Sequence, residues 1–314
     1  MTGNTLYGRD CLRLLDLTPD EFALVLDTAT AQKAAWAAGV HDKPCADEAV
    51  AIILEKPSLR TRSSFEIGTY RLGAHPLVMS DDHSAFSRGE TVHDTVLVLE
   101  RFVDAIVLRT FAQSKVEEVA HWASVPVVNA LTDDYHPCQG LADALTIREH
   151  RGTLAGLTLA YVGDGNNMAN TYLELGALAG MHVCLACPSG YGVRKAIVEE
   201  CTAVAAATGG SIELCASPQT AVAGADVVIT DTWTSMGDEA EHDARLAAFA
   251  GYQVDDALMA LAAPDALFLH CLPAHRGEEV TDSVMDGPHS VIFDEAENRL
   301  HAQKALLSLL MEEG

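Results

Sequence analysis

The chain has 314 residues, of which 49% are hydrophobic and 21% charged, a composition typical of a globular protein and not of a disordered one. This length favours two domains. The formal net charge of −25 argues against nucleic acid or an anionic membrane as a partner, because both require an extended basic face. The sequence contains neither an apolar run of 18 residues nor a signal peptide, so we expect a cytoplasmic protein whose eight cysteines stay reduced.

Short apolar runs alternate with amphipathic segments along most of the chain, as they do in parallel sheets covered by helices. We therefore predict an α/β fold with two doubly wound parallel-sheet domains that carry helices on both faces. The predicted domains span residues 1–146 and 147–290. A C-terminal segment over residues 291–314 should return to the first domain and pack a helix against it.

The first predicted helix is opened by a capping box at Thr18-Pro19-Asp20-Glu21 and runs through Ala29. In the first domain, strands are expected at 49–54, 76–79, 105–108 and 126–128, with helices ending at Gly73 and near 91–102 and 115–123. A helix around 140–150 should join the domains. Further strands are expected at 157–162, 183–186, 212–215, 227–230 and 266–269. The chain should close with a short strand at 291–293 and a helix over 295–311.

An anion site is predicted at Ser58-Leu59-Arg60-Thr61-Arg62, where a strand ends and a helix begins. Backbone N–H groups, hydroxyls and guanidinium groups converge there and suit a phosphate. Residues 60 and 62 lie about 200° apart on a helix, so we assign Arg60 to the phosphate and Arg62 to a structural ion pair. Arg109 ends another strand and should reach the same sheet edge. The alternative is an ordinary capped helix with solvated arginines.

Two further segments could supply hydrogen-bond donors to a carbonyl oxygen. His136-Pro137-Cys138-Gln139 follows a strand, so the His136 imidazole and the Gln139 amide could point into the same crevice, although a histidine before proline is often only a turn residue. Arg299 lies on the last helix. It is either a surface charge or a third arginine of the site.

The second domain offers a region for a small amine ligand. Gly163-Asp164-Gly165-Asn166-Asn167-Met168 only partly matches a dinucleotide-binding turn, so we favour a helix N-terminus that binds a small ligand. The segment from Asp231 to Gly237 follows a strand and places a carboxylate and a hydroxyl near an ammonium-bearing ligand. The alternative is an irregular loop with Trp233 packed down.

Metal binding is not predicted. His270 and Cys271 are neighbours at a strand end and should point to opposite faces, and Cys184 and Cys187 lie within a strand and do not form a knuckle. We expect neither a metal nor a cofactor.

Taken in chain order, these motifs resemble those of the aspartate and ornithine carbamoyltransferase family, most closely its ornithine branch. The resemblance covers about residues 55–305 and rests on five elements: the phosphate motif, His-Pro-Cys-Gln, Asp followed by Ser-Met-Gly, His-Cys-Leu-Pro, and Glu-Asn-Arg-Leu-His. It implies transfer of the carbamoyl group of carbamoyl phosphate to the side-chain amine of L-ornithine. The implied assembly is a homotrimer with active sites near subunit interfaces, whose domains close on substrate.

The resemblance also assigns residues to each ligand. It implies that the phosphate is held by Ser58, Leu59, Arg60, Thr61 and Arg109. The carbamoyl group would be surrounded by His136, Gln139, Cys271, Leu272 and Arg299, and ornithine would be held by Asn167, Asp231, Ser235 and Met236. Among these, the residues expected to act in catalysis are Arg60, Arg109, His136, Cys271 and Arg299. The family often has glutamine where this chain has Ala85, so contacts of the loop 85–90 could differ.

The expected chemistry agrees with these residue types. Attack by a neutral amine on the carbamoyl carbon builds negative charge on its oxygen and on the departing phosphate, so the site needs preorganised donors more than a nucleophile. Two alternatives stay open at this stage. One is a carbamoyltransferase acting on another amine, such as putrescine or an acylated ornithine, and the other is a nucleotide-binding regulator that uses Gly163–Asn167 without catalysis.

Overall fold

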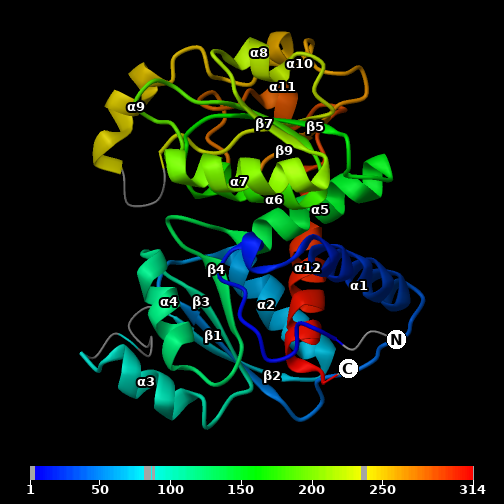
Figure 1. Ribbon diagram of the computed structural model, residues 1–314, viewed down its shortest axis with the longest axis vertical. Helices are drawn as coiled ribbons and strands as arrows, with labels where there is room; N and C mark the ends of the chain where they lie inside the picture. The colour runs from blue at the N-terminus through cyan, green and yellow to red at the C-terminus, as the bar shows by residue number, and fades with distance from the viewer. Residues whose placement is uncertain (1–3, 81–85, 87–88, 235–238, 314) are drawn as a thin grey trace. The chain divides into compact units, whose positions relative to one another are not determined.

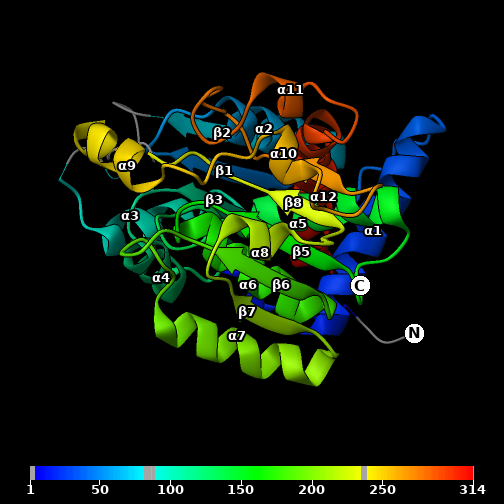
Figure 2. The ribbon, with the colours of Figure 1, turned by 90° about the horizontal axis from the view of Figure 1, so that it is seen from above.

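The computed structural model describes residues 4–80, 86, 89–234 and 239–313. The chain forms two compact units, Met1–Leu145 with Glu297–Gly314 (unit 1) and Thr146–Ala296 (unit 2). Each unit contains one parallel sheet with helices on both of its faces (Figures 1 and 2). The predicted α/β class with two doubly wound domains is therefore confirmed.

The sheet of unit 1 has four parallel strands in the order β2-β1-β3-β4. Their bounds are β1 (Ala49–Leu54), β2 (His75–Ser80), β3 (Ala105–Arg109) and β4 (Val127–Leu131). Strand β1 is central, and the run Val50–Leu54 is buried on both faces, as a continuous apolar run in a parallel sheet predicts. Its bounds are those expected from the sequence.

The helices of unit 1 cover both faces of this sheet (Figure 1). They are α1 (Pro19–Ala37), α2 (Leu59–Leu72), α3 (Val92–Leu99), α4 (Gln113–Trp122), the start of α5 (Pro137–Arg151) and most of α12 (Ile292–Met311), with a 3-10 turn η1 (Leu14–Asp16). Helices α3 and α4 pack Val96 and Val116 against Ile53 and Ile106. The other face carries α1, α2 and α12.

Helix α1 begins as predicted but extends further. Thr18 accepts a hydrogen bond from the Glu21 N–H while the Glu21 carboxylate accepts one from the Thr18 N–H, which is a complete capping box. The helix continues to Ala37 instead of Ala29. Its far half is fixed by α12, because Lys33 Nζ donates to Asn298 Oδ1 at 2.8 Å. The C-terminal helix thus packs on the first unit, as predicted.

The sheet of unit 2 has five parallel strands in the order β7-β6-β5-β8-β9. Their bounds are β5 (Thr158–Val162), β6 (His182–Ala186), β7 (Ser211–Leu214), β8 (Val227–Ile229) and β9 (Leu267–Leu269). Two long helices, α6 (Asn167–Ala179) and α7 (Lys195–Thr208), lie on one face (Figure 1). The shorter helices are α8 (Pro218–Val222), α9 (His242–Ala248), α10 (Asp256–Met259) and α11 (Asp282–Met285), with a 3-10 turn η3 (Glu239–Glu241). Of these, α8, α10 and α11 share an apolar core with the opposite face of the sheet.

One predicted element is wrong. Residues 291–293 do not form a strand, because α12 already begins at Ile292. One residue earlier, Ser290 forms an isolated bridge with Phe268 of β9. Ile292 then packs into the unit 2 core as part of the helix. An apolar run at a buried helix start has the same appearance in sequence as a short strand.

No helix in the described part of the chain is both long enough and apolar enough to cross a membrane. All eight cysteines lie among the described residues and are free thiols.

Candidate active site

Both sheets gather polar residues where their strands end. In the unit 1 sheet, β1 and β3 are neighbours, and the chain runs from β1 to β2 on one side and from β3 to β4 on the other. In the unit 2 sheet, β5 and β8 are neighbours in the same way, because the chain runs from β5 to β6 on one side and from β8 to β9 on the other. Open α/β sheets bind ligands at such a switch point, outside the carboxyl ends of the strands. In unit 1, Ser58 follows β1 and Arg109 is the last residue of β3. In unit 2, Asn166 follows β5 and Asp231 follows β8. The structure therefore provides one candidate half-site in each unit.

The anion site of unit 1 is built on the N-terminus of α2. Ser58 caps the helix by accepting a hydrogen bond from the Thr61 N–H at 3.2 Å, and its hydroxyl donates to Thr61 Oγ1 at 2.9 Å. Arg109 Nη1 donates to the same Thr61 hydroxyl at 3.2 Å. Thr61 is fully buried and Arg109 nearly so. The predicted meeting of the Ser58 segment with Arg109 is thus observed in the structure.

The other members of the motif differ in exposure. The Leu59 side chain is 78% exposed, so the backbone N–H is the group that it can offer to an anion. Arg62 Nε lies 3.2 Å from Glu66 Oε2 in an exposed ion pair, which confirms the structural role predicted for it. Lys56, which is not among the predicted site residues, is buried, and its Nζ lies 2.9 Å from Asp133 Oδ1. That pair ties the turn before α2 to the loop after β4.

His136 stands at the start of α5, directly before Pro137, and is 4% exposed. Its carbonyl accepts the Gln139 N–H at 3.0 Å, which fixes the first turn of the helix. Burial, followed by the charges of Arg299, Arg109 and Arg60, holds the pKa of His136 well below its usual value. The imidazole is therefore neutral at pH 7 and can donate one hydrogen bond without bringing a further positive charge.

Arg299 is 2% exposed, so it is not a surface charge. Its Nη1 donates to Gln139 Oε1 at 2.8 Å and its Nε to Gln303 Oε1 at 2.6 Å. Gln303 Nε2 in turn donates to Ser64 Oγ at 2.8 Å, and the Ser64 hydroxyl donates to the Arg60 carbonyl at 2.6 Å. This chain of hydrogen bonds joins α5, α12 and α2. It excludes the surface-charge alternative for Arg299, and contact of Arg299 with a substrate stays a prediction.

The half-site of unit 2 is organised around Asp231. Asn166 caps α6 by accepting hydrogen bonds from the Met168 and Ala169 N–H groups, and its amide donates to Asp231 Oδ2 at 2.9 Å. Cys271 Sγ donates to the other carboxylate oxygen, Oδ1, at 3.2 Å. Asp231 is 8% exposed. A buried carboxylate oriented by two neutral donors suits a ligand ammonium group.

Asn167 is half-buried in the first turn of α6, next to the cap. Ser235 and Met236, which were also predicted to hold ornithine, lie outside the described residues, and so does Ala85. The assignment of all these residues to ornithine or to carbamoyl phosphate stays a prediction.

The glycine-rich turn of unit 2 serves chain packing. A side chain at Gly165 would place a Cβ 2.5 Å from the carbonyl carbon of Gly192 and 2.6 Å from the Tyr191 oxygen. The Gly165 N–H donates to that Tyr191 carbonyl at 2.8 Å. Another loop of the chain thus lies directly against this glycine, which accounts for it without a dinucleotide.

The segment after β9 turns sharply at Leu272, which has φ +58° and is followed by a cis peptide bond to Pro273. The Leu272 N–H donates to His270 Nδ1 at 2.9 Å, and His270 Nε2 lies 3.1 Å from Glu279 Oε1. The prediction that His270 and Cys271 point apart is wrong, because ligand atoms of Asp231, His270 and Cys271 lie within 4.8 Å of one another. Both ring nitrogens of His270 are nevertheless engaged, so its imidazole holds the turn.

Sequence reasoning missed four supporting residues: Lys56, Arg245, Glu279 and Gln303. Gln303 could have been found, because it lies four residues after Arg299 on the same helix face. Arg245 could not, because only the fold brings its Nη1 within 2.7 Å of Asp164 Oδ2. Glu279 likewise meets His270 only through the turn at Leu272.

Comparison with known proteins identifies the family. A model of the aspartate/ornithine carbamoyltransferase carbamoyl-P binding domain matches residues 9–149, and a model of the Asp/Orn binding domain matches residues 155–310. Ornithine carbamoyltransferase of Symbiobacterium thermophilum is 52% identical over 98% of this chain and 99% of its own length. The enzyme of Acidothermus cellulolyticus is 55% identical over 95% of each.

Solved structures agree with these matches. Ornithine carbamoyltransferase from Pyrococcus furiosus superposes with a TM-score of 0.95 at 47% identity and covers 98% of both chains. The structure of the Gloeobacter violaceus enzyme gives a TM-score of 0.88 at 44% identity. Two family models that together span nearly the whole chain, supported by these relatives, establish that it belongs to the aspartate/ornithine carbamoyltransferase family.

Proposed function

We propose that this protein transfers the carbamoyl group of carbamoyl phosphate to the side-chain amine of L-ornithine, giving L-citrulline and phosphate. The observation that carries the proposal is identity above 50% over nearly the full length of relatives named ornithine carbamoyltransferase. The buried donors of unit 1 and the buried carboxylate of unit 2 support it, because they match an anionic donor substrate and an ammonium-bearing acceptor.

In unit 1, Ser58, Thr61, Arg60 and Arg109 would hold the phosphate, together with the backbone N–H of Leu59. The neutral His136 imidazole would donate to the carbamoyl oxygen. Negative charge builds on that oxygen as the amine nitrogen bonds to the carbamoyl carbon, and donors already in place stabilise it without reorganising. The bond from the carbamoyl carbon to the phosphate oxygen then breaks, phosphate leaves with the electron pair, and the extra proton of the amine passes to the departing phosphate or to solvent.

Arg299 and Gln139 would complete the surroundings of the carbamoyl group. The hydrogen bonds of Arg299 to Gln139 and Gln303 fix its guanidinium before substrate arrives. A guanidinium that is already held in position stabilises the transition state more than an equally charged but mobile one. No covalent intermediate with the protein is needed in this scheme, because Cys271 is used as a contact and not as a nucleophile.

In unit 2, Asp231 would bind the α-ammonium group of ornithine, with Asn167, Ser235 and Met236 around it.

We also propose a homotrimer located in the cytoplasm. The oligomeric state can be measured by light scattering coupled to size-exclusion chromatography, and a monomer at micromolar concentration would contradict the trimer.

An acceptor panel tests the proposed activity. The purified chain is incubated with carbamoyl phosphate and either L-ornithine, putrescine or an acylated ornithine, and the ureido product is quantified. We expect kcat/KM for ornithine to exceed the others by about 10–100-fold, because acylation removes the charge that Asp231 would bind and putrescine lacks the α-carboxylate of ornithine. Preference for putrescine would instead support a different amine substrate, and absence of any ureido product would refute carbamoyl transfer.

The variant Arg60→Ala tests the anion site separately. Calorimetry with carbamoyl phosphate should show a large loss of binding while circular dichroism stays unchanged. Arg62→Ala is the matched control, since Arg62 pairs with Glu66 on the surface and should not affect binding. Equal binding by both variants would refute the assignment of Arg60.

A further inference from the structure

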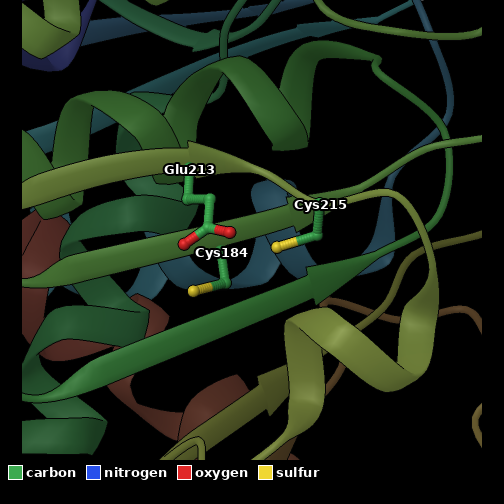
Figure 3. Close-up of side chains that lie close together, drawn as sticks. All are labelled: Cys184, Glu213 and Cys215. Carbon is green, nitrogen blue, oxygen red and sulfur yellow. The ribbon is translucent and has the colours of Figure 1, made fainter.

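A second group of chemically active side chains lies at the edge of the unit 2 sheet, apart from the residues already described. Figure 3 shows Cys184 and Cys215 with the Glu213 carboxylate on one face of neighbouring strands. Cys184 on β6 is the register partner of Glu213 on β7. Cys215 comes two residues after Glu213 and therefore projects to the same face. The ligand atoms of the three residues all lie within 4.8 Å of one another.

The sequence analysis had considered Cys184 together with Cys187 and rejected that pair as a metal site. The structure places a different thiol beside Cys184, because Cys215 comes from the end of the adjacent strand. Only the parallel pairing of β6 with β7 brings the two thiols together. Cys187 lies one residue beyond β6 and is not part of the group.

The charge of this group is that of the Glu213 carboxylate, since the two cysteines are thiols. Burial raises the pKa of both thiols, with added repulsion from Glu213, and that of Cys215 reaches about 12. Within the described ranges, no lysine, arginine or histidine forms an ion pair with Glu213. His182 faces the same side of the strand but its Nδ1 is engaged with Ser211 Oγ at 2.9 Å. Binding of a metal cation displaces thiol protons, so the ion would take the two sulfurs and the unpaired Glu213 carboxylate as its ligands.

We propose that Cys184, Glu213 and Cys215 bind a divalent zinc ion, with solvent as a fourth ligand. Two sulfur donors exclude magnesium and calcium, which take oxygen ligands, and favour a borderline-soft ion that accepts tetrahedral geometry. Zinc–sulfur bonds of about 2.3 Å separate two sulfurs by about 3.8 Å in a tetrahedron. From a spacing of at most 4.8 Å, small side-chain rotations reach that geometry.

The site would act on the stability of the sheet edge. Strand β7 has four residues, three of them exposed, and its one strand partner is β6. An ion held by Cys184 from β6, and by Glu213 and Cys215 from β7 and its end, would join the two strands through side chains. Because a ligand that binds only the folded chain stabilises it, the thermal midpoint should rise with free zinc concentration.

Cobalt titration of the reduced full-length chain tests the proposal. The experiment uses a Cys271→Ser background, which removes the thiol of the Asp231, His270 and Cys271 group as a competing ligand. We expect one equivalent of Co²⁺ to give a thiolate charge-transfer band in the near ultraviolet, and Zn²⁺ to displace it. Adding Cys184→Ser or Cys215→Ser should lower the affinity at least about tenfold, because losses even in the outer shell of a metal site cost about 10–100-fold.

The matched control is Cys187→Ser, which removes a neighbouring thiol of similar burial and should leave the band and the affinity unchanged. Glu213→Gln keeps the shape of an exposed side chain, so its expected weakening of binding cannot come from misfolding. The proposal is overturned if no thiolate band forms, if the band survives loss of both Cys184 and Cys215, or if Cys187→Ser abolishes it. A Cys184–Cys215 disulfide that persists in reductant, detected by thiol counting, would also overturn it.

Discussion

Replacing Gln303 with leucine should lower catalysis even though Gln303 touches no proposed substrate. Gln303 is fully buried, accepts a hydrogen bond from Arg299 Nε at 2.6 Å and donates one to Ser64 Oγ at 2.8 Å. Leucine has a similar volume but makes neither bond. The bond from the charged guanidinium is worth about 1.5–3 kcal/mol and the neutral one about 1 kcal/mol, so unit 1 should lose about 3 kcal/mol of stability.

The effect on catalysis follows from the position of Arg299. Its bond to Gln139 remains in Gln303→Leu, so the guanidinium is still held on that side. A displacement of about 1 Å costs about 100-fold in rate at most, so we expect kcat/KM for carbamoyl phosphate to fall by about 10–100-fold. Steady-state kinetics of citrulline formation and urea unfolding of the same preparations measure the two effects independently.

Ser64→Ala separates positioning from stability. This variant removes the hydrogen bonds of the Ser64 hydroxyl to Gln303 and to the Arg60 carbonyl but keeps the bond from Arg299 to Gln303. It should therefore cost about 1–3 kcal/mol of stability and leave kcat/KM nearly unchanged. Gln303→Glu restores an acceptor for Arg299 and should recover part of the rate lost in the leucine variant. Equal losses of kcat/KM in Ser64→Ala and Gln303→Leu, or no loss in the latter, would refute the positioning role.

Three further predictions concern His136, Asp231 and Gly165. The pKa of His136 is lower in the folded chain than in the unfolded one, so at a pH between these two pKa values the unfolded state binds more protons. The free energy of unfolding should therefore decrease as the pH falls below about 6.5, by up to about 1.4 kcal/mol per pH unit. Urea midpoints of wild type and His136→Gln at several pH values measure how much His136 contributes to this pH dependence of stability. Identical pH slopes for the two proteins would contradict the prediction. Asp231→Asn should raise KM for ornithine by about 10–100-fold and leave KM for carbamoyl phosphate unchanged in initial-rate kinetics; a comparable rise in both would argue against the assignment. Gly165→Ala should lower the free energy of unfolding by about 1–3 kcal/mol, because the added Cβ overpacks against the Gly192 backbone. Gly192→Ala is the control and should leave the thermal midpoint unchanged, since a Cβ there meets no atom within 4 Å. Equal midpoints for the two variants would be inconsistent with the packing role.

Most of the fold could be predicted because buried parallel strands appear in the sequence as continuous apolar runs. Strand β1 was placed at its observed bounds for this reason. The start of α12 could not be placed, because Val291-Ile292-Phe293 has the composition of a strand and its helical state depends on tertiary contacts. The Glu295 carboxylate accepts the buried His270 N–H at 2.9 Å, which only the folded unit reveals.

The candidate site was predictable to the extent that strand ends converge. Ser58 and Arg109 were expected at one edge of the sheet from their positions alone, and both contact Thr61. The role of Arg299 was not decidable, because a helical residue can face either solvent or the interior. Only its hydrogen bonds to Gln139 and Gln303 distinguish the two.

The composition of unit 1 from two distant segments has a consequence for the order in which the protein can fold. Arg299 and Gln303 are synthesised after the whole of unit 2, and Asn4 Nδ2 bonds to the Leu309 carbonyl 305 residues away. While the chain emerges from the ribosome, unit 1 therefore exposes the α1 and α2 surfaces that α12 later covers, whereas unit 2 can close as soon as its own residues are made. The unit whose residues are made first is thus the last to be completed.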